Sequence, residues 1–501
     1  MTLLIEFQII RQDKMKIVII TEGSSKIGFG HITRCTSIYQ AFKVNGLKPN
    51  FIVNGDSSVE SILKNTKYEI FDWLEYPEKL YKSLKGSSII IIDSYLADKG
   101  LYERIAQFSS VNIYIDDNNR INYPKGILVN GSIHAEKLDY LFSNEIDYLL
   151  GSQFIPLRRQ FWNIPDKEVN PTLQNVMITF GGDDLRNLTP KILKILNENY
   201  PSLNKKIVIG SGFNNVSDIE KLKDEKTELI YYPHADGMLN TMLESDITIS
   251  AGGQTLYELA RVGVPTIAIS VAHNQTHNVE NWQKVGFIEL AGYWDDENLL
   301  KNILDKLELL KDRKIRLEKK NIGQEAVDGK GALKIAKYSL NRYYSNKITL
   351  RPAMYRDVRN IFELSNDNDV RENSFNHSKI RFEDHEKWFK SKIEDENNIF
   401  LVVNIQDNFA GQVRFELEGD SATVSISIKE EFRELGLGKN FLKKAIDYLK
   451  VNSPQISMVN AYIKDNNPSS LKLFEKMDFE FNKILFIKNQ KAFEFTYMMG
   501  D

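Results

Sequence analysis

The segment Gly28-Phe29-Gly30-His31 combines a flexible turn with a side chain that can accept a proton. Glycines at 28 and 30 let the backbone approach a ligand closely, and the helix that follows begins with free N–H groups and a positive potential. That positive end disfavours a charged imidazole, so His31 is expected to stay neutral and to act as a general base. The alternative is that His31 only caps the helix. Thr33 stands where a dinucleotide fingerprint has its third glycine, which argues against nicotinamide binding.

A second glycine turn, Ala251-Gly252-Gly253-Gln254-Thr255, follows an apolar run and precedes another helical pattern. Such a turn at a helix N-terminus predicts a seat for a diphosphate. Glu258 lies about one turn into that helix, where its carboxylate can accept from both hydroxyls of a ribose. The alternative is an ordinary strand-to-helix turn with a solvated glutamate. Two glycine turns facing one cleft favour the nucleotide interpretation.

A third turn, from Arg433 through Gly436 and Gly438 to Lys439, follows the expected strand at 422–428 and begins an amphipathic helix. Successive N–H groups of an Arg-x-x-Gly-x-Gly turn point into one concavity the size of an anion. A Gly-x-Gly alone says little. Its place between a strand and a helix predicts a cradle for a pyrophosphate.

The elements that must position these turns are short apolar runs separated by helical patterns. Such runs predict parallel sheets covered on both faces. The expected strands are 16–21, 49–54, 88–93 and 111–116 in a first unit, and 175–181, 205–210, 227–232, 245–250 and 265–270 in a second. The segment 156–171, with its prolines and charges, is expected to link the two units. Runs at 348–353, 399–404, 410–417 and 422–428 predict a third, α+β domain.

These patterns predict an extension at 1–14, α/β domains at 15–160 and 170–345, and a final domain at 347–501. The net charge of −3 gives no electrostatic footprint for nucleic acid, and no apolar run reaches the roughly 20 residues that span a bilayer. Cys35 is the only cysteine, which excludes an intramolecular disulfide and fits a reducing compartment. The opening segment lacks a basic n-region, so no signal peptide is predicted and a cytoplasmic location is expected.

Residues 15 to about 345 resemble the hydrolases that release UDP from UDP-2,4-diacetamido-2,4,6-trideoxy-altropyranose in pseudaminic acid synthesis. Those enzymes are relatives of MurG-type glycosyltransferases and have the GT-B fold of two Rossmann-like domains. The matching segments are GFGHITRC (28–35), IIDSY (91–95), IDD (115–117), ITFGGDD (178–184), SAGGQTLYELARVGVP (250–265) and AHNQTHN (272–278).

The resemblance implies that His31 activates water against the anomeric carbon and that Tyr95 and Asn274 line the sugar pocket. The implied catalytic set is therefore His31, Tyr95 and Asn274, and the implied substrate contacts are Gly28, Gly30, Arg34, Gly252, Gly253, Gln254, Thr255 and Glu258. A glycosyl phosphate already carries a good leaving group, so no metal is predicted. His273 and His277 lack the glutamate of an HExxH site, and the pairs Asp116-Asp117 and Asp183-Asp184 are expected in turns and caps.

Residues 348–495 resemble the GNAT acetyltransferases, through the Arg433–Lys439 turn and the segment NNPSSLKLFEKMDF (466–479). The resemblance implies acetyl-CoA as co-substrate, with its pyrophosphate on Arg433, Gly436, Gly438 and Lys439 and with Asn466 near the pantetheine. The start ITLRPAMYRDV and the segment HEKWF (385–389) point to the amino-sugar N-acetyltransferases of the same pathway.

Two departures from the acetyltransferase pattern concern its general acid. Phe474 stands where many members carry the tyrosine that protonates the leaving thiolate, and Asp478 stands where Lys-x-Gly-Phe is common. Glu372 and His385 are candidates for the base that accepts the amine proton. For each of them the alternative is a structural or merely exposed side chain.

The sequence thus predicts a GT-B hydrolase followed by a C-terminal GNAT domain. The GNAT domain is expected to acetylate the C4 amine of a UDP-linked amino sugar, and the hydrolase then to release UDP. The predicted partners are this UDP-amino sugar and acetyl-CoA, without metal, nucleic acid or membrane; the oligomeric state is not indicated. The alternatives are a GT-B glycosyltransferase with an accessory or inactive GNAT domain, a hydrolase of a legionaminic-type pathway, and a GNAT domain that only binds.

Overall fold

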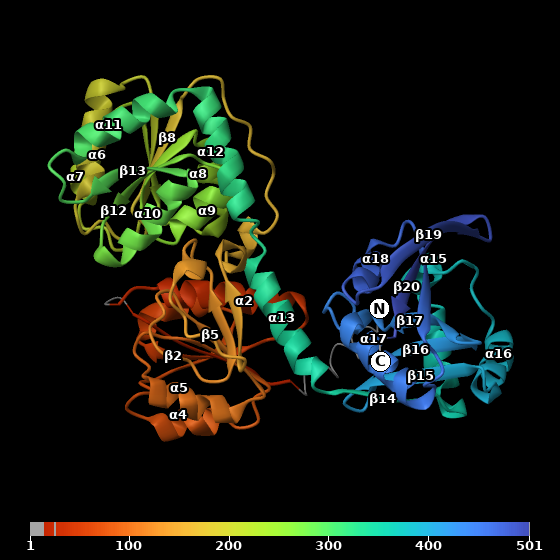
Figure 1. Ribbon diagram of the computed structural model, residues 1–501. Helices are drawn as coiled ribbons and strands as arrows, with labels where there is room; N and C mark the ends of the chain where they lie inside the picture. Colours follow the sequence, from red (N-terminus) through yellow and green to blue (C-terminus); the bar gives the residue numbers. More distant parts are fainter. Residues whose placement is uncertain (1–14, 25–26, 500–501) are drawn as a thin grey trace. The chain divides into compact units, whose positions relative to one another are not determined.

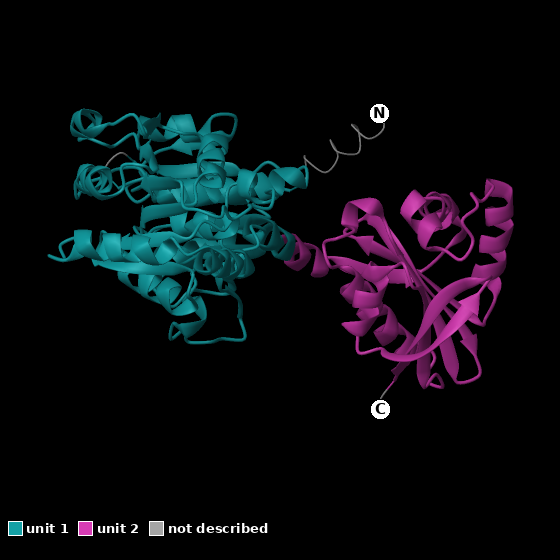
Figure 2. Ribbon diagram, turned by 90° about the horizontal axis from the view of Figure 1, so that it is seen from above, with its two compact units in different colours: residues 1–339 teal, residues 340–501 magenta. Residues whose placement is uncertain are grey.

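The computed structural model describes residues 15–24 and 27–499, so the expected extension at 1–14 lies outside the described residues. The chain divides into two compact units, the first ending at Ser339 and the second beginning at Leu340 (Figure 2). This division falls inside helix α13 (Gly331–Ser345). In the described part of the chain, no helix is both long enough and apolar enough to cross a membrane.

The first half of unit 1 is a parallel sheet of seven strands in the order β3-β2-β1-β4-β5-β6-β7. The strands are β1 (Ile17–Gly23), β2 (Asn50–Gly55), β3 (Lys67–Ile70), β4 (Ile89–Asp93), β5 (Val111–Ile115), β6 (Gly126–Asn130) and β7 (Ile146–Leu150). Apolar side chains of α4 (Pro77–Leu84) and α5 (Lys99–Ile105) pack on one face, and α2 (Gly30–Val44) covers the other (Figure 1). A short helix, α3 (Glu60–Leu63), precedes β3.

The second half of unit 1 is a parallel sheet of six strands in the order β10-β9-β8-β11-β12-β13. The strands are β8 (Asn175–Thr179), β9 (Asn204–Ile209), β10 (Thr227–Tyr231), β11 (Ile247–Ala251), β12 (Thr266–Ser270) and β13 (Ile288–Tyr293). Helices α6 (Leu188–Asn199), α7 (Val216–Leu222) and α11 (Leu299–Leu310) form the core on one face. Helices α8 (Ala235–Glu244), α9 (Thr255–Val262) and α10 (Thr276–Val285) form it on the other, and α12 (Arg313–Ala326) contacts α9 (Figure 1).

Both sheets of unit 1 wind outward from a central pair of strands, β1 and β4 in the first and β8 and β11 in the second. In such doubly wound sheets a ligand binds beyond the carboxyl ends of the two strands where the winding reverses. The predicted pair of Rossmann-like domains is confirmed. Strands β3, β6, β7 and β13 were not among the expected ones.

Unit 2 is built on a mixed sheet of seven strands in the order β14-β15-β16-β17-β18-β20-β19. The strands are β14 (Ile348–Pro352), β15 (Asn398–Ile405), β16 (Asn408–Glu418), β17 (Ser421–Ile428), β18 (Met458–Lys464), β19 (Glu480–Ile487) and β20 (Gln490–Met498). The helices are α14 (Val358–Ser365), α15 (Asn368–Asn373), α16 (Phe382–Glu394), α17 (Gly438–Asn452) and α18 (Pro468–Glu475). The predicted α+β class of this domain is confirmed, although the strands after β17 were not foreseen.

The end of α13 belongs to unit 2 through its own contacts. Asn341 donates to the carbonyl of Leu435 at 2.9 Å, and the ring of Tyr344 lies 5.6 Å from that of Phe432. The hydroxyl of Ser345 accepts from the side chain of Asn440. Asn341, Tyr344 and Ser345 lie before position 347, where the sequence suggested that the last domain begins.

We therefore expect a fragment of residues 340–501 to be more stable than one of residues 347–501. The shorter fragment loses the buried rings of Tyr343 and Tyr344, and deleting one large buried side chain costs about 3–5 kcal/mol. Urea denaturation of the two fragments measures the difference. Equal midpoints would show that the end of α13 contributes nothing to unit 2.

Candidate active sites

His31 lies in the first turn of α2, where the winding of the first sheet reverses. Its Nδ1 atom is 2.6 Å from Oδ1 of Asp93, the last residue of β4, whose side chain is fully buried. The two residues meet because β1 and β4 are adjacent and parallel. The alternative of His31 as a helix cap is wrong, since Phe29 is the N-cap of α2 and no side chain caps it.

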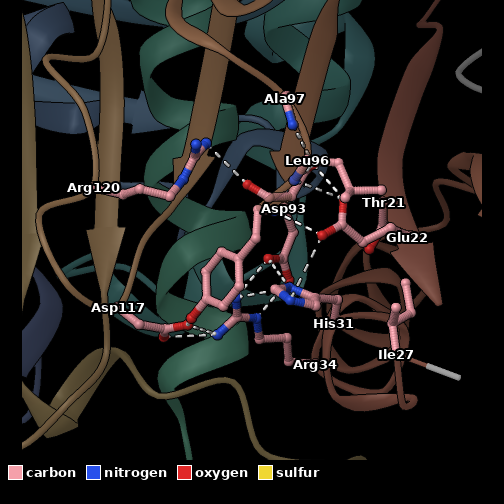
Figure 3. Close-up of polar contacts among 12 residues, drawn as sticks. Thr21, Glu22, Ile27, His31, Arg34, Asp93, Leu96, Ala97, Asp117 and Arg120 are labelled. Atoms are coloured by element: carbon pink, nitrogen blue, oxygen red, sulfur yellow. Dashed lines mark hydrogen bonds and ion pairs between the residues drawn. The ribbon is translucent and has the colours of Figure 1, made fainter. Parts of the chain in front are cut away.

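Arg34 and Asp117 complete a charged network around this pair (Figure 3). Arg34 donates to both carboxylate oxygens of Asp93 at 2.5 Å and to both oxygens of Asp117 at 2.7 Å. Burial opposes ionisation of Asp93, but Arg34 and His31 outweigh it and hold the pKa of this carboxyl well below its usual value. Arg34, predicted as a substrate contact, is thus engaged with two carboxylates.

Tyr95 follows β4 and stands beside the imidazole. Its ring lies 4.6 Å from that of His31, edge to face, and its hydroxyl donates to Asp117 at 2.5 Å. Burial and the charge of Asp117 raise the pKa of Tyr95 far above its usual value, so the phenol keeps its proton. Tyr95 is 43% exposed, which leaves it available to a sugar.

This geometry determines which nitrogen of His31 can act. The Asp93 carboxylate can only accept, and it lies closer to Nδ1, at 2.6 Å, than the Arg34 guanidinium does, at 3.0 Å. We therefore assign the proton of the neutral ring to Nδ1, which leaves the lone pair on Nε2. Nε2 can then remove a proton from water, and Asp93 stabilises the positive ring that forms. The group is therefore a general base held in one orientation.

Gly28 and Gly30 shape the approach to this base. Gly28 has φ +88°, in the left-handed region that favours glycine, and its N–H donates to the carbonyl of Ser24 at 2.9 Å. Gly30 is the first residue of α2, and a Cβ built at either glycine meets no atom of the described residues within 4 Å. The backbone at both positions is therefore open, as a close contact with a ligand requires.

The second glycine turn lies at the reversal point of the second sheet, directly after β11. The side chain of Gln275 accepts from the N–H of Gly252 at 3.1 Å, and Asn278 donates to the carbonyl of Gly252 at 2.8 Å. A Cβ at Gly252 would lie 2.2 Å from a methyl group of Val279, so only glycine fits there. A Cβ at Gly253 meets nothing closer than 3.9 Å, which leaves that side of the turn open.

Helix α9 begins at this turn without a side-chain cap. Gln254 is the N-cap and makes no capping bond, and Thr255 is the first helical residue. The first N–H groups of a helix have no acceptor within it, and they favour an anion. The turn can therefore hold a phosphate group.

Glu258 is buried in α9 and faces the segment that links the two sheets. Arg158 donates to both of its carboxylate oxygens at 2.8 Å. Burial raises the pKa of Glu258, and Arg158 opposes this effect. A ribose would have to share this carboxylate with Arg158.

Asn274 and the two nearby histidines lie on the surface at the start of α10. Asn274 is exposed beside Gln275, and His277 lies with its ring 6.3 Å from that of His134. Within residues 15–24 and 27–499, no three His, Cys, Asp or Glu side chains gather in a way that would hold a metal ion.

The candidate site of unit 2 includes a gap in its sheet. In the described register, β17 and β18 pair only through Ser421–Thr423 and Met458–Asn460. Beyond these residues the two parallel strands separate, and their backbone groups are available to an extended chain inserted between them. Such a gap suits a ligand with amide groups.

The third turn follows β17, one of the two strands that border this gap. Gly436 has φ +76°, Leu437 is the N-cap of α17 without a capping bond, and Lys439 is the second, exposed residue of that helix. Asn466 is exposed in the loop that follows β18 on the opposite side of the gap. An anion can bind the uncapped N–H groups at Gly438.

Arg433 makes contacts that the sequence did not suggest. Its guanidinium donates to Asp367 at 2.7 Å, to Asp369 at 2.8 Å and to the carbonyl of Ile428 at 2.8 Å. Asp367 is the N-cap of α15, so Arg433 fixes the start of that helix to the end of β17. At the other end of α15, Lys464 of β18 donates to the carbonyl of Glu372 at 2.8 Å. Helix α15 is thus tied to both strands that border the gap.

The surroundings of the remaining candidate residues of unit 2 favour structural roles or simple exposure to solvent. Phe474 is buried with its ring 4.9 Å from that of Phe479. Asp478 has φ +61°, which explains why glycine is common there. Glu372 is exposed, whereas His385 is 1% exposed and lies among aromatic rings of α14 and α16, out of reach of an amine.

Sequence reasoning missed the carboxylates around His31. Glu22 and Asp93 end two apolar runs, and Asp117 directly follows another. An acidic residue at the carboxyl end of a buried parallel strand was the available signal, because these ends meet at one edge. The pairing of Arg433 with Asp367 and Asp369, which are more than sixty positions away, left no local signal.

The comparisons with known proteins agree with the division of the chain into two units. Residues 175–333 match the glycosyltransferase family 28 C-terminal domain, and residues 347–480 match an acetyltransferase (GNAT) domain. The chain therefore joins a GT-B part to a GNAT domain, a combination that belongs to sugar-nucleotide processing and acetyl transfer.

Three individual relatives match this chain. An uncharacterized protein of Methanocaldococcus jannaschii is 24% identical over 94% of this chain and 97% of its own length. The Helicobacter pylori protein named pseudaminic acid cytidylyltransferase and UDP-2,4-diacetamido-2,4,6-trideoxy-beta-L-altropyranose hydrolase is 23% identical over 56% of this chain, which spans 48% of that protein. The spore coat polysaccharide biosynthesis protein SpsG of Bacillus subtilis is 22% identical over 64% of this chain and 96% of its own length.

Among solved structures, spermidine N-acetyltransferase from Vibrio cholerae in complex with CoA and spermine is 23% identical, with a TM-score of 0.29. The match covers 30% of this chain and 96% of that protein.

The contacts of Arg433 lead to a prediction about CoA binding. In Arg433→Gln we expect the CoA dissociation constant to stay within about threefold, while amide exchange in residues 367–378 becomes about tenfold faster because α15 loses its charge-assisted bonds. Calorimetry with CoA and hydrogen-exchange mass spectrometry of the full chain measure the two effects. The matched control Lys439→Gln should weaken CoA binding without changing exchange in α15. A large loss of CoA affinity in Arg433→Gln with unchanged exchange would make Arg433 a phosphate ligand, as the sequence suggested.

The burial of His385 leads us to expect that the free energy of unfolding depends on pH. Burial lowers its pKa to about 4, below its ordinary value near 6.5. The unfolded chain therefore binds the extra proton first, and stability that is present above about pH 6.5 is lost as the pH falls toward 4. Replacing His385 with Phe should remove about 2 kcal/mol of this loss. Exchange protection of residues 382–405 in the full chain, measured at pH 7 and pH 4.5, tests it; an identical pH response in both proteins contradicts it.

Proposed function

We propose that unit 1 hydrolyses a UDP-linked 2,4-diacetamido-2,4,6-trideoxyhexose and releases UDP. The observation that carries the proposal is the His31–Asp93 pair, which leaves Nε2 as a base at the reversal point of the first sheet. A second reversal point in the same unit presents the open turn at Gly253 and the uncapped start of α9, where the diphosphate would bind. The similarity to the Helicobacter pylori hydrolase supports the choice of substrate.

In the proposed reaction, Nε2 of His31 takes a proton from water as the water oxygen bonds to the anomeric carbon. The bond between that carbon and the diphosphate oxygen breaks, and UDP leaves with the electron pair. Asp93 keeps the proton on Nδ1 and stabilises the imidazolium. Tyr95 and Asn274 would contact the sugar, and Gln254, Thr255 and Glu258 would contact UDP.

Unit 2 is proposed to acetylate the C4 amine of the corresponding UDP-amino sugar with acetyl-CoA. The pantetheine amides would lie between β17 and β18, and the pyrophosphate would bind the turn at Gly436, Gly438 and Lys439. The amine attacks the thioester carbonyl, the carbon–sulfur bond breaks, and CoA leaves as the thiol. Phe474 cannot donate a proton, so water would accept the proton that the amine nitrogen loses and would deliver a proton to the departing thiolate.

The hydrolysis is tested by His31→Ala. We expect kcat to fall by about 10²–10⁴, the usual contribution of a general base, with UDP affinity unchanged. The measurement is UDP release from the synthetic UDP-diacetamido sugar in water enriched in ¹⁸O, with mass spectrometry of the sugar. Label on the anomeric oxygen is expected. Release at the wild-type rate by His31→Ala would remove His31 from the reaction, and transfer to an acceptor sugar without label would identify a glycosyltransferase.

A further inference from the structure

Glu22 is a buried carboxylate on the opposite side of the imidazole from Asp93. It lies at the end of β1 and is 2% exposed, and its Oε1 is 4.0 Å from Nε2 of His31 (Figure 3). The N–H of Tyr95 donates to Oε1 at 2.7 Å, and the hydroxyl of Ser94 and the N–H of Leu96 donate to Oε2. The carboxylate is therefore held in a fixed position.

The two atoms that face each other are both acceptors in the resting site. In the neutral ring, whose single proton lies on Nδ1 and is donated to Asp93, Nε2 has no proton, and an ionised carboxylate has none to give. A direct hydrogen bond between them is also excluded by the separation of 4.0 Å. The group that satisfies both is a donor with two hydrogens, and a water oxygen can lie about 2.8 Å from each of two atoms at this separation.

We propose that Glu22 and His31 together hold the nucleophilic water of the hydrolysis. This inference rests on the proposed function of unit 1. One hydrogen of the water points to Oε1 of Glu22 and the other to Nε2 of His31, so its lone pairs point away from both and toward the sugar. The reacting oxygen is thereby oriented as well as activated.

The proton balance of the step follows from this arrangement. The O–H bond directed at Nε2 breaks and its proton moves to His31, the oxygen bonds to the anomeric carbon, and the bond to the diphosphate breaks. The second hydrogen stays on the oxygen and remains bonded to Glu22, so the product is the free sugar with its anomeric hydroxyl. The imidazolium then lies between the carboxylates of Asp93 and Glu22.

The alternative role of Glu22 is to support the turn at residues 94–96. A purely structural role would lower stability and disturb the position of Tyr95, which changes KM as well as kcat. A role in holding water lowers kcat while substrate binding is retained. The two roles therefore differ in a measurable way.

The test compares Glu22→Gln with Asp98→Asn in the full chain. Asp98 caps α5 just beyond the same turn and does not contact Glu22, so its variant controls for local destabilisation. In Glu22→Gln the amide directs N–H groups or a neutral oxygen at the water, and kcat should fall about 10²-fold, the cost of a misplaced reacting group. KM and the dissociation constant of UDP should change less than about threefold, and Asp98→Asn should keep the wild-type kcat.

Three outcomes would overturn the inference. A Glu22→Gln protein with the wild-type kcat shows that the carboxylate holds no reacting water, and the proposed hydrolysis then stands without it. A loss of kcat accompanied by an equal rise in KM, or matched by Asp98→Asn, assigns Glu22 to the fold of the turn. A wild-type chain that releases UDP without ¹⁸O in the sugar overturns the proposed function itself, and the inference with it.

Discussion

The fully buried carboxylate of Asp93 sets the conditions for the rest of the first site. A charge removed from water is tolerated only when it is paired and hydrogen-bonded. Arg34 supplies the compensating charge and His31 supplies a further bond, which draws both side chains of α2 toward the end of β4. Arg34 then has donors left for Asp117, and Asp117 in turn fixes the hydroxyl of Tyr95. The orientation of the base is thus a consequence of neutralising one buried charge.

The candidate site of unit 2 is formed by backbone hydrogen-bonding groups, whereas the first site is formed by buried charges. The separation of β17 from β18 exposes hydrogen-bonding groups that a sheet would otherwise use. An opening of this kind weakens the sheet, and α15 crosses between its two sides through the bonds of Arg433 and Lys464. Arg433, which the sequence assigned to a phosphate, therefore holds the borders of the gap in place together with Lys464.

The sequence predicted those strands and turns that are determined by residues close together in the chain. The run 89–92 consists of four isoleucines because β4 is buried on both faces. Glycines mark the turns at 252–253 and 436–438 because close contacts or a positive φ require them. Edge strand β3 alternates exposed and half-buried residues and was missed. Side-chain partners were not predictable in the same way. Glu258 was assigned to a ribose, but the residue that binds it, Arg158, lies one hundred positions earlier in a segment without periodicity.

The surroundings of His31 show why such long-range partners decide chemistry. The start of α2 disfavours a positive ring, an effect worth about 0.3–1 kcal/mol near a helix end. A charged hydrogen bond to a buried carboxylate is worth about 1.5–3 kcal/mol, and Asp93 makes one at 2.6 Å while Glu22 adds a second negative charge. Asp93 and Glu22 therefore face the two ring nitrogens, and they stabilise the positive charge that forms on the ring when Nε2 takes the proton of water. A base in this setting gains most after it has taken the proton, which is when the attack on the anomeric carbon needs its stabilisation.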